Sequence, residues 1–101
     1  MIVEISFVPI GVGTSLSQYI AKVINHIDES GLKYQLTPMG TIIEADWEEI
    51  SSFIDYSHNL LFQMGVERII TNIKIDYRLD KKSSMQDKID SVKKKRVEVD
   101  V

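Results

Sequence analysis

The stretch Gly11-Val12-Gly13-Thr14-Ser15 combines flexible glycines with hydroxyl side chains at a predicted helix start. Glycines let a ligand approach the backbone closely, and the free N–H groups of a helix N-terminus attract an anionic or carbonyl group. The stretch lacks the lysine and the third glycine of the nucleotide-binding fingerprints. Alone, it is best interpreted as a flexible connection with an ordinary helix cap. A second polar turn opposite it would favour a ligand contact.

Such a turn is predicted at Thr37-Pro38-Met39-Gly40-Thr41, where proline and glycine stand at the positions that a tight turn requires. Short β-favouring segments precede and follow it, so the region is predicted to be a hairpin. Its hydroxyl groups, backbone groups and Glu44 offer hydrogen-bonding partners to a small polar ligand.

Hydrophobic periodicity predicts the elements that position these groups. Alternation indicates strands, whereas apolar residues at helical spacing between a cap and a glycine indicate helices. The predicted elements are a strand over 1–8, a helix over 15–30 opened by a Ser15–Gln18 capping box, hairpin strands over 34–36 and 41–44, a helix over 46–64 opened by an Asp46–Glu49 capping box, and a strand over 67–77. A weaker helix is predicted over 83–96, opened by Ser83 and Gln86, and the alternating tail 97–101 is a candidate addition to a sheet edge.

The order strand, helix, strand, strand, helix, strand predicts an α+β domain, a ferredoxin-like βαββαβ plait with a four-stranded antiparallel sheet and an additional C-terminal helix. Residues 1–101 are predicted to form one domain, with the core plait in 1–80. Right-handed crossovers bring the loop 9–15 and the turn 37–41 to the same end of the sheet. We therefore expect these two turns to face each other.

The sheet face that the two helices leave open is predicted to mix charged, polar and apolar side chains. The polar members are Glu4, Ser6, Glu44, Asn72, Lys74, Asp76 and Arg78, and the apolar members are Ile2, Val8, Ile42 and Ile70. Charge pairs across a solvated sheet are worth only about 0.2–1 kcal/mol each, so a water-exposed face is the simpler interpretation. The apolar members favour a second subunit, and we expect a homo-oligomer.

Composition argues against several classes of function. The 101-residue chain has a formal charge of −3 and no cysteine, so it offers no broad basic surface and no thiolate chemistry. His26 and His58 have no predicted partner nucleophile, and the run 93–96 is interpreted as a solvated helix end. We predict a cytoplasmic protein without catalytic residues, metal or cofactor, which binds neither nucleic acid nor membrane.

The assembled pattern resembles the small thiamine-binding protein family, and the resemblance covers nearly the whole chain. The matching segments are Glu4-Ile5-Ser6 leading to Pro9-Ile10-Gly11, Thr14 to Tyr19, Ser30 to Tyr34, Thr37 to Thr41 with Glu44, and Ile73 to Arg78. The resemblance implies a ferredoxin-like subunit, dimers that pair into tetramers, and binding of thiamine or its hydroxymethylpyrimidine moiety without turnover.

On this resemblance, we expect the ligand ring near the two turns, with two polar partners on the sheet. The predicted ligand-binding residues are Ser6, Thr14, Ser15, Thr37, Met39, Gly40, Thr41 and Glu44. Hydroxyls and a carboxylate suit an aminopyrimidine, and Met39 would add an adaptable apolar wall. The alternative is a regulatory or assembly module of ACT-like topology, whose sheet serves subunit contact and binds no thiamine.

Overall fold

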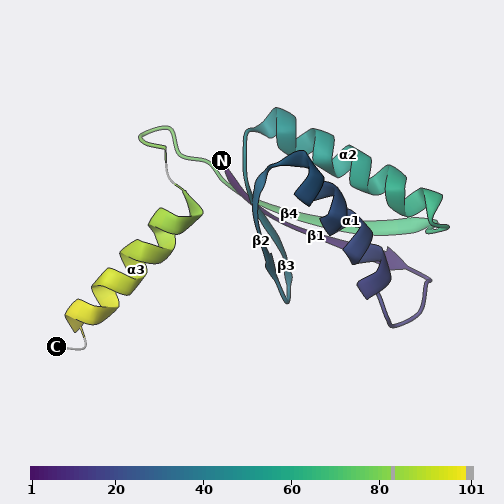
Figure 1. Cartoon of the computed structure of the whole chain (residues 1–101), viewed down its shortest axis with the longest axis horizontal. Helices are drawn as coiled ribbons and strands as arrows, with labels where there is room; N and C mark the ends of the chain where they lie inside the picture. The colour runs from purple at the N-terminus through teal and green to yellow at the C-terminus, as the bar shows by residue number, and fades with distance from the viewer. Residues whose placement is uncertain (83, 100–101) are drawn as a thin grey trace.

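The computed structural model describes residues 1–82 and 84–99 of the chain (Figure 1). Their secondary structure follows the predicted order. The elements are β1 (Ile2–Ile10), α1 (Ser17–Ser30), β2 (Lys33–Thr37), β3 (Gly40–Glu44), α2 (Trp47–Gln63), β4 (Arg68–Asp76) and α3 (Met85–Val99). This confirms the six elements of the plait and the helix that follows them.

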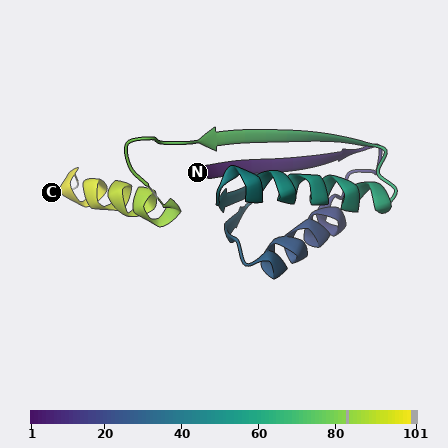
Figure 2. The ribbon, with the colours of Figure 1, turned by 90° about the horizontal axis from the view of Figure 1, so that it is seen from above.

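The four strands form one antiparallel sheet in the order β2-β3-β1-β4. Helices α1 and α2 both cover the same face of this sheet, and the other face carries neither of them (Figures 1 and 2). The ferredoxin-like plait predicted from the sequence is therefore confirmed. Strand β4 lies at one edge of the sheet and β2 at the other.

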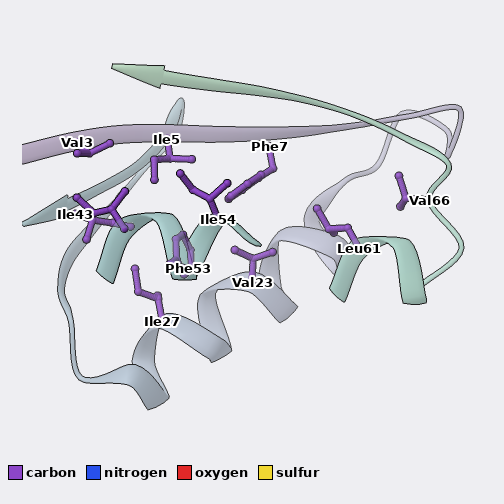
Figure 3. Packing of buried hydrophobic residues seen from close by; sticks show 11 residues of the cluster. Val3, Ile5, Phe7, Val23, Ile27, Ile43, Phe53, Ile54, Leu61 and Val66 are labelled. Carbon is purple, nitrogen blue, oxygen red and sulfur yellow. The ribbon is translucent and has the colours of Figure 1, made fainter. Parts of the chain in front are cut away.

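The hydrophobic core lies between the sheet and the two covering helices (Figure 3). Alternate side chains of β1, namely Val3, Ile5 and Phe7, point toward the helices and are buried. They meet Val23 and Ile27 of α1 and a buried stripe of α2. The buried residues of that stripe are Ile50, Phe53, Ile54, Ser57 and Leu61. Trp47, the first residue of α2, is 48% exposed.

The helix starts differ in how they are capped. The Asp46–Glu49 capping box is confirmed, since the Glu49 N–H donates to Asp46 Oδ1 at 2.8 Å and Glu49 Oε1 accepts from the Asp46 N–H at 3.5 Å. The Ser15–Gln18 box is wrong. Helix α1 begins at Ser17 with Leu16 at the cap and no side-chain cap bond, because the glycine-containing loop continues through Ser15.

Helix α3 begins at Met85, and the Ser84 hydroxyl accepts a 3.0 Å hydrogen bond from the Asp87 N–H. The predicted cap residue, Ser83, lies outside the described residues. The prediction that 97–101 form a strand-like tail was wrong for 97–99, which continue the helix; residues 100–101 are not described.

Helix α3 extends away from the rest of the domain (Figures 1 and 2). The radius of gyration is 15.9 Å, against about 13 Å for a compact chain of this length. Half-buried Met85 and Ile89 lie near the sheet, whereas Val92 is 68% exposed. The helix is thus anchored at its N-terminal end.

Candidate functional site

The hairpin turn between β2 and β3 is organised by the Thr37 hydroxyl. Thr37 Oγ1 donates to the Gly40 carbonyl oxygen at 2.8 Å and accepts from the Met39 N–H at 3.2 Å. Gly40 lies directly against β1, and a Cβ atom placed there would stand 2.9 Å from the Ile5 carbonyl oxygen. The turn therefore presents an exposed Met39 beside a tightly packed glycine.

The two polar turns do not meet as closely as the sequence suggests. Thr41 pairs with Ile5, so the turn reaches only the level of Ser6, while β1 continues to Ile10. Four residues of strand correspond to about 13 Å. Thr14 and Ser15 follow in an exposed loop beyond that strand end. Both turns lie toward the same end of the sheet, but at different heights along it.

The predicted site residues thus fall into separate groups. Ser6, Thr37 and Gly40 are neighbours at the hairpin, and Met39 projects from it. Thr41 is 7% exposed and faces the helix-covered side of the sheet with Ile5. Thr14 and Ser15 form a second group in the loop, and Glu44 stands at the far end of β3.

The open sheet face holds polar pairs in register. Glu4 is opposite Lys74, and Ser6 is opposite Asn72, whose side-chain amide donates to Ser6 Oγ at 3.4 Å. These residues and Ile73 line a hollow of about 150 Å³. Ligand pockets usually enclose about 300–1,000 Å³, so this hollow needs a second surface to enclose a ligand.

Glu44 is occupied by contacts within the chain. Its Oε1 accepts a 2.7 Å hydrogen bond from the Met85 N–H, and its Oε2 lies 3.8 Å from Lys33 Nζ. A carboxylate at a helix N-terminus is favoured by the free N–H groups and by the helix dipole. Glu44 therefore anchors α3 to the sheet, a contact that sequence spacing did not indicate.

A second anchor joins Lys88 of α3 to Asp76 of β4. The hydrogen bond from the Lys88 ammonium is the largest cause that lowers the pKa of Asp76 below its ordinary value, and the nearby positive charges of Lys88 and Arg78 lower it further. The ionised carboxylate is thus the form that favours the folded contact. The stabilisation of the folded state by this contact is present above the ordinary Asp pKa, and it is lost as the pH falls through the lowered pKa of Asp76.

We expect the substitution Lys88→Met to raise the pKa of Asp76 toward its ordinary value, because the main donor to the carboxylate is removed. An NMR titration of the Asp76 carboxyl carbon measures this shift. The matched control is Lys93→Met on the exposed side of the same helix, which should leave the titration unchanged. An unchanged Asp76 titration in Lys88→Met would contradict the assigned anchor.

A larger concave surface lies between the end of α1 and the start of α2. It encloses about 520 Å³. Its aromatic centre is His26, which stacks on Tyr56 with ring centroids 3.6 Å apart and lies parallel to Phe53 at 5.9 Å. The carboxylates at its border are Asp46, Glu48 and Glu49. We call this surface the α1/α2 cleft; it combines aromatic rings with negative charge.

The chemistry of the α1/α2 cleft suits a cationic or electron-poor aromatic ring. Aromatic faces attract cations, and the adjacent carboxylates strengthen that attraction. The sequence predicted no partner nucleophile for His26 and did not connect it with Tyr56. The sequence feature that could have indicated this cleft is the Asp46–Glu49 capping box. It places carboxylates at the start of α2, and the end of α1 lies across the cleft from that start.

In the part of the chain that the structure describes, no group of three or more His, Cys, Asp or Glu side chains is arranged to hold a metal ion. Among the same residues, no helix is both long and apolar enough to cross a membrane.

Comparison with known proteins identifies close relatives over most of the chain. The sequence model of a family described as "Thiamine-binding protein" matches residues 3–93. UPF0045 protein YqgV of Bacillus subtilis is 42% identical over 98 residues, which are 92% of this chain and 94% of the relative.

Solved structures show the same fold. Hypothetical protein MJ1052 of Methanocaldococcus jannaschii has a TM-score of 0.83 at 32% identity, covering 91% of this chain and 94% of that one. A Thermotoga maritima protein assigned provisionally to thiamine biosynthesis or salvage has a TM-score of 0.78 at 26% identity, covering 90% of this chain and 96% of that one.

Proposed function

Because the chain belongs to the thiamine-binding protein family, we propose that it binds thiamine or the hydroxymethylpyrimidine moiety of thiamine without converting it. The family match over residues 3–93 carries this proposal. The Thermotoga maritima relative adds support, since its provisional assignment concerns the same vitamin. The function is that of a small-molecule binding protein.

Within a single subunit, the α1/α2 cleft is our first proposal for the ligand site. Thiamine joins an aminopyrimidine to a thiazolium cation, so it needs hydrogen-bonding groups, an aromatic surface and negative charge. The cleft supplies Tyr56 and His26 as a stacked pair and Glu49 as a carboxylate, in a volume of about 520 Å³. That volume lies within the range of ordinary ligand pockets.

The residues predicted from the sequence give the second proposal. Ser6, Thr37 and Gly40 are neighbours on or beside the open face, where a second subunit could close the hollow of about 150 Å³. In this arrangement, the Ser6 hydroxyl and the turn backbone would bind the aminopyrimidine. Thr14 and Ser15 would belong to this binding site only if a partner subunit or the ligand spanned the distance between their loop and the hairpin.

Titration calorimetry with thiamine and with hydroxymethylpyrimidine tests the function. We expect saturable heat with thiamine, and we expect Tyr56→Ala to weaken binding about three- to thirtyfold, the range that loss of one cation–aromatic contact produces. The matched control is Tyr77→Ala, which removes a 74% exposed tyrosine far along the chain from the cleft.

The variants separate the two sites. Loss of affinity in Tyr56→Ala with an unchanged Ser6→Ala favours the α1/α2 cleft, and the reverse pattern favours the open face. Absence of heat and of any thermal shift at millimolar ligand contradicts thiamine binding. That result would favour the ACT-like alternative, in which the sheet serves subunit contact alone.

We also propose that subunits assemble into dimers and that dimers pair into a tetramer through the open face. What supports this is the mixed surface of that face, where Ile42 and Ile2 lie beside Glu4 and Lys74. A sheet face that contacted only water would be expected to carry fewer apolar side chains. Light scattering coupled to size exclusion measures the subunit number.

A further inference from the structure

His26 lies flat against the aromatic ring to which the proposed function assigns a cationic ligand. Its imidazole and the Tyr56 ring have centroids 3.6 Å apart, and their planes are inclined by 18°. At this separation two rings are in van der Waals contact, so no third ring fits between them. Both residues line the α1/α2 cleft, so the contact between their rings lies within it. A ligand ring that takes this face of Tyr56 must first displace His26.

Ring contacts hold the His26 side chain in place. Besides Tyr56, it faces Phe53, whose ring lies parallel to the imidazole with centroids 5.9 Å apart. His58, the other histidine of the chain, is held differently, since its Nε2 lies 2.6 Å from Thr71 Oγ1. Displacing His26 from Tyr56 therefore breaks a stacking contact, but it breaks no hydrogen bond between the imidazole and a described residue.

The surroundings of His26 attract positive charge. From the end of α1 and the turn after it, the cleft is lined by Ser30 and Leu32, which carry no charge. One helical turn from His26 on α1 itself stand Lys22 and Glu29, whose charges offset each other. The charged or titratable groups that face the cleft from α2 are Asp46, Glu48, Glu49 and Tyr56. A cation in the cleft thus meets carboxylates and an aromatic ring, and no lysine or arginine of the described residues lines it.

A protonated histidine has the same chemistry as the cation that the cleft is proposed to bind. An imidazolium and the thiazolium of thiamine are both planar five-membered aromatic rings with one positive charge. Histidine is also the side chain that exchanges its neutral form for its charged form around neutral pH. In the charged form, the His26 ring takes the place of the ligand beside Tyr56 and the carboxylates, and it repels a second cation.

We propose that His26 is an internal competitor for the cation site of the α1/α2 cleft. Its protonated ring occupies the Tyr56 face and excludes a cationic ligand, whereas its neutral ring gives way. Binding is therefore tighter at higher pH, and it releases the proton of any His26 that is charged, because linkage is reciprocal. The inference rests on the proposed function and on the α1/α2 cleft as the ligand site, and it assigns to that site a regulation by pH.

Calorimetry with two probes at about pH 6 and about pH 8 tests the proposal. The probes are thiamine and N-benzylthiazolium, whose charge is permanent and which lacks the titratable aminopyrimidine. We expect the dissociation constant of each probe to be about three- to tenfold higher at the lower pH, because only the fraction of protein with a neutral His26 is competent to bind. Thermal unfolding at both pH values verifies that the fold is intact.

Two substitutions separate the charge of His26 from its ring. His26→Gln removes both, and His26→Phe keeps a ring that stacks on Tyr56 but cannot be protonated. For each variant, the dissociation constants of N-benzylthiazolium at the two pH values should agree within about twofold. The matched control is His58→Gln, which removes the other histidine of the chain and should retain the pH dependence of the wild type.

A proton count provides a measurement on the unmodified protein. At about pH 6.5, the heat of binding is compared in phosphate and in bis-Tris buffer, whose ionisation enthalpies differ. The difference between the two heats gives the number of protons that are exchanged for each ligand bound. We expect the wild-type protein to release part of one proton, and His26→Gln to release none.

The outcomes distinguish this inference from the proposed function. Weaker binding at low pH with proton release in the wild type, and loss of both effects in His26→Gln, supports the inference. Equal affinity of the wild type at the two pH values, or a pH dependence that persists in His26→Gln, overturns the inference and leaves thiamine binding in place. Absence of binding of both probes at either pH overturns the proposed function and this inference together.

Discussion

The Ile5→Ala variant is expected to lose about 2–5 kcal/mol of unfolding free energy, the cost of truncating a fully buried isoleucine. Ile5 is 1% exposed and belongs to a central strand, where it lies between β3 and β4. Both covering helices depend on this layer, so little relaxation is available to fill the cavity. Urea denaturation followed by circular dichroism measures the loss.

Leu36→Ala is the matched control for this prediction. Leu36 pairs with Thr41, which pairs with Ile5, so Leu36 and Ile5 stand in one row on the helix-covered face. Leu36 lies in the edge strand β2 and is 58% exposed. Its truncation should cost less than about 1 kcal/mol. Equal losses in the two variants would contradict the assigned core.

The Gly40→Ala variant is expected to lose about 1–3 kcal/mol, which is the usual cost of inserting atoms into a packed site. The added Cβ atom would stand 2.9 Å from the Ile5 carbonyl oxygen. That oxygen belongs to the backbone of a central strand and cannot rotate away as a side chain would. Denaturant unfolding reports the loss, and a shift of the Ile5 and Thr41 amide resonances locates it.

Met39→Ala tests whether the loss belongs to Gly40 or to the turn in general. Met39 is in the same turn and is 83% exposed, so its truncation should change stability by less than about 0.5 kcal/mol. A large loss in Met39→Ala, or none in Gly40→Ala, would mean that the turn is not packed against β1 as described.

Both predictions concern the hairpin and the central strand, which position the open-face residues Ser6 and Asn72. A variant that destabilises this region could therefore lose ligand affinity even though the substituted residue does not contact the ligand. For this reason, the binding experiments rest on Tyr56→Ala and Ser6→Ala, whose side chains lie outside the buried core.

The amino-acid sequence determined the elements, their order and the faces of each strand. Alternation along β1 puts Val3, Ile5 and Phe7 on the side opposite the predicted open face, and all three are buried. The Asp46–Glu49 box and Gly31 marked helix ends, because caps and left-handed glycines act over a few neighbouring residues. Features of this kind can be predicted from sequence because all the residues that determine them are neighbours in the chain. The exception is Ser15, which does not cap α1 because the preceding loop continues past it and the helix begins at Ser17.

Tertiary structure alone decided how far these elements reach and what lies beside them. Ile5 and Ile73 have the same periodic signal, yet one is buried and the other is 42% exposed, because only strand order makes β4 an edge. The stacking of His26 on Tyr56 joins residues of two helices. The hydrogen bond from the Met85 N–H of α3 to Glu44 joins residues 41 positions apart. Periodicity encodes which face a side chain takes, whereas its exposure and partners depend on packing between distant segments.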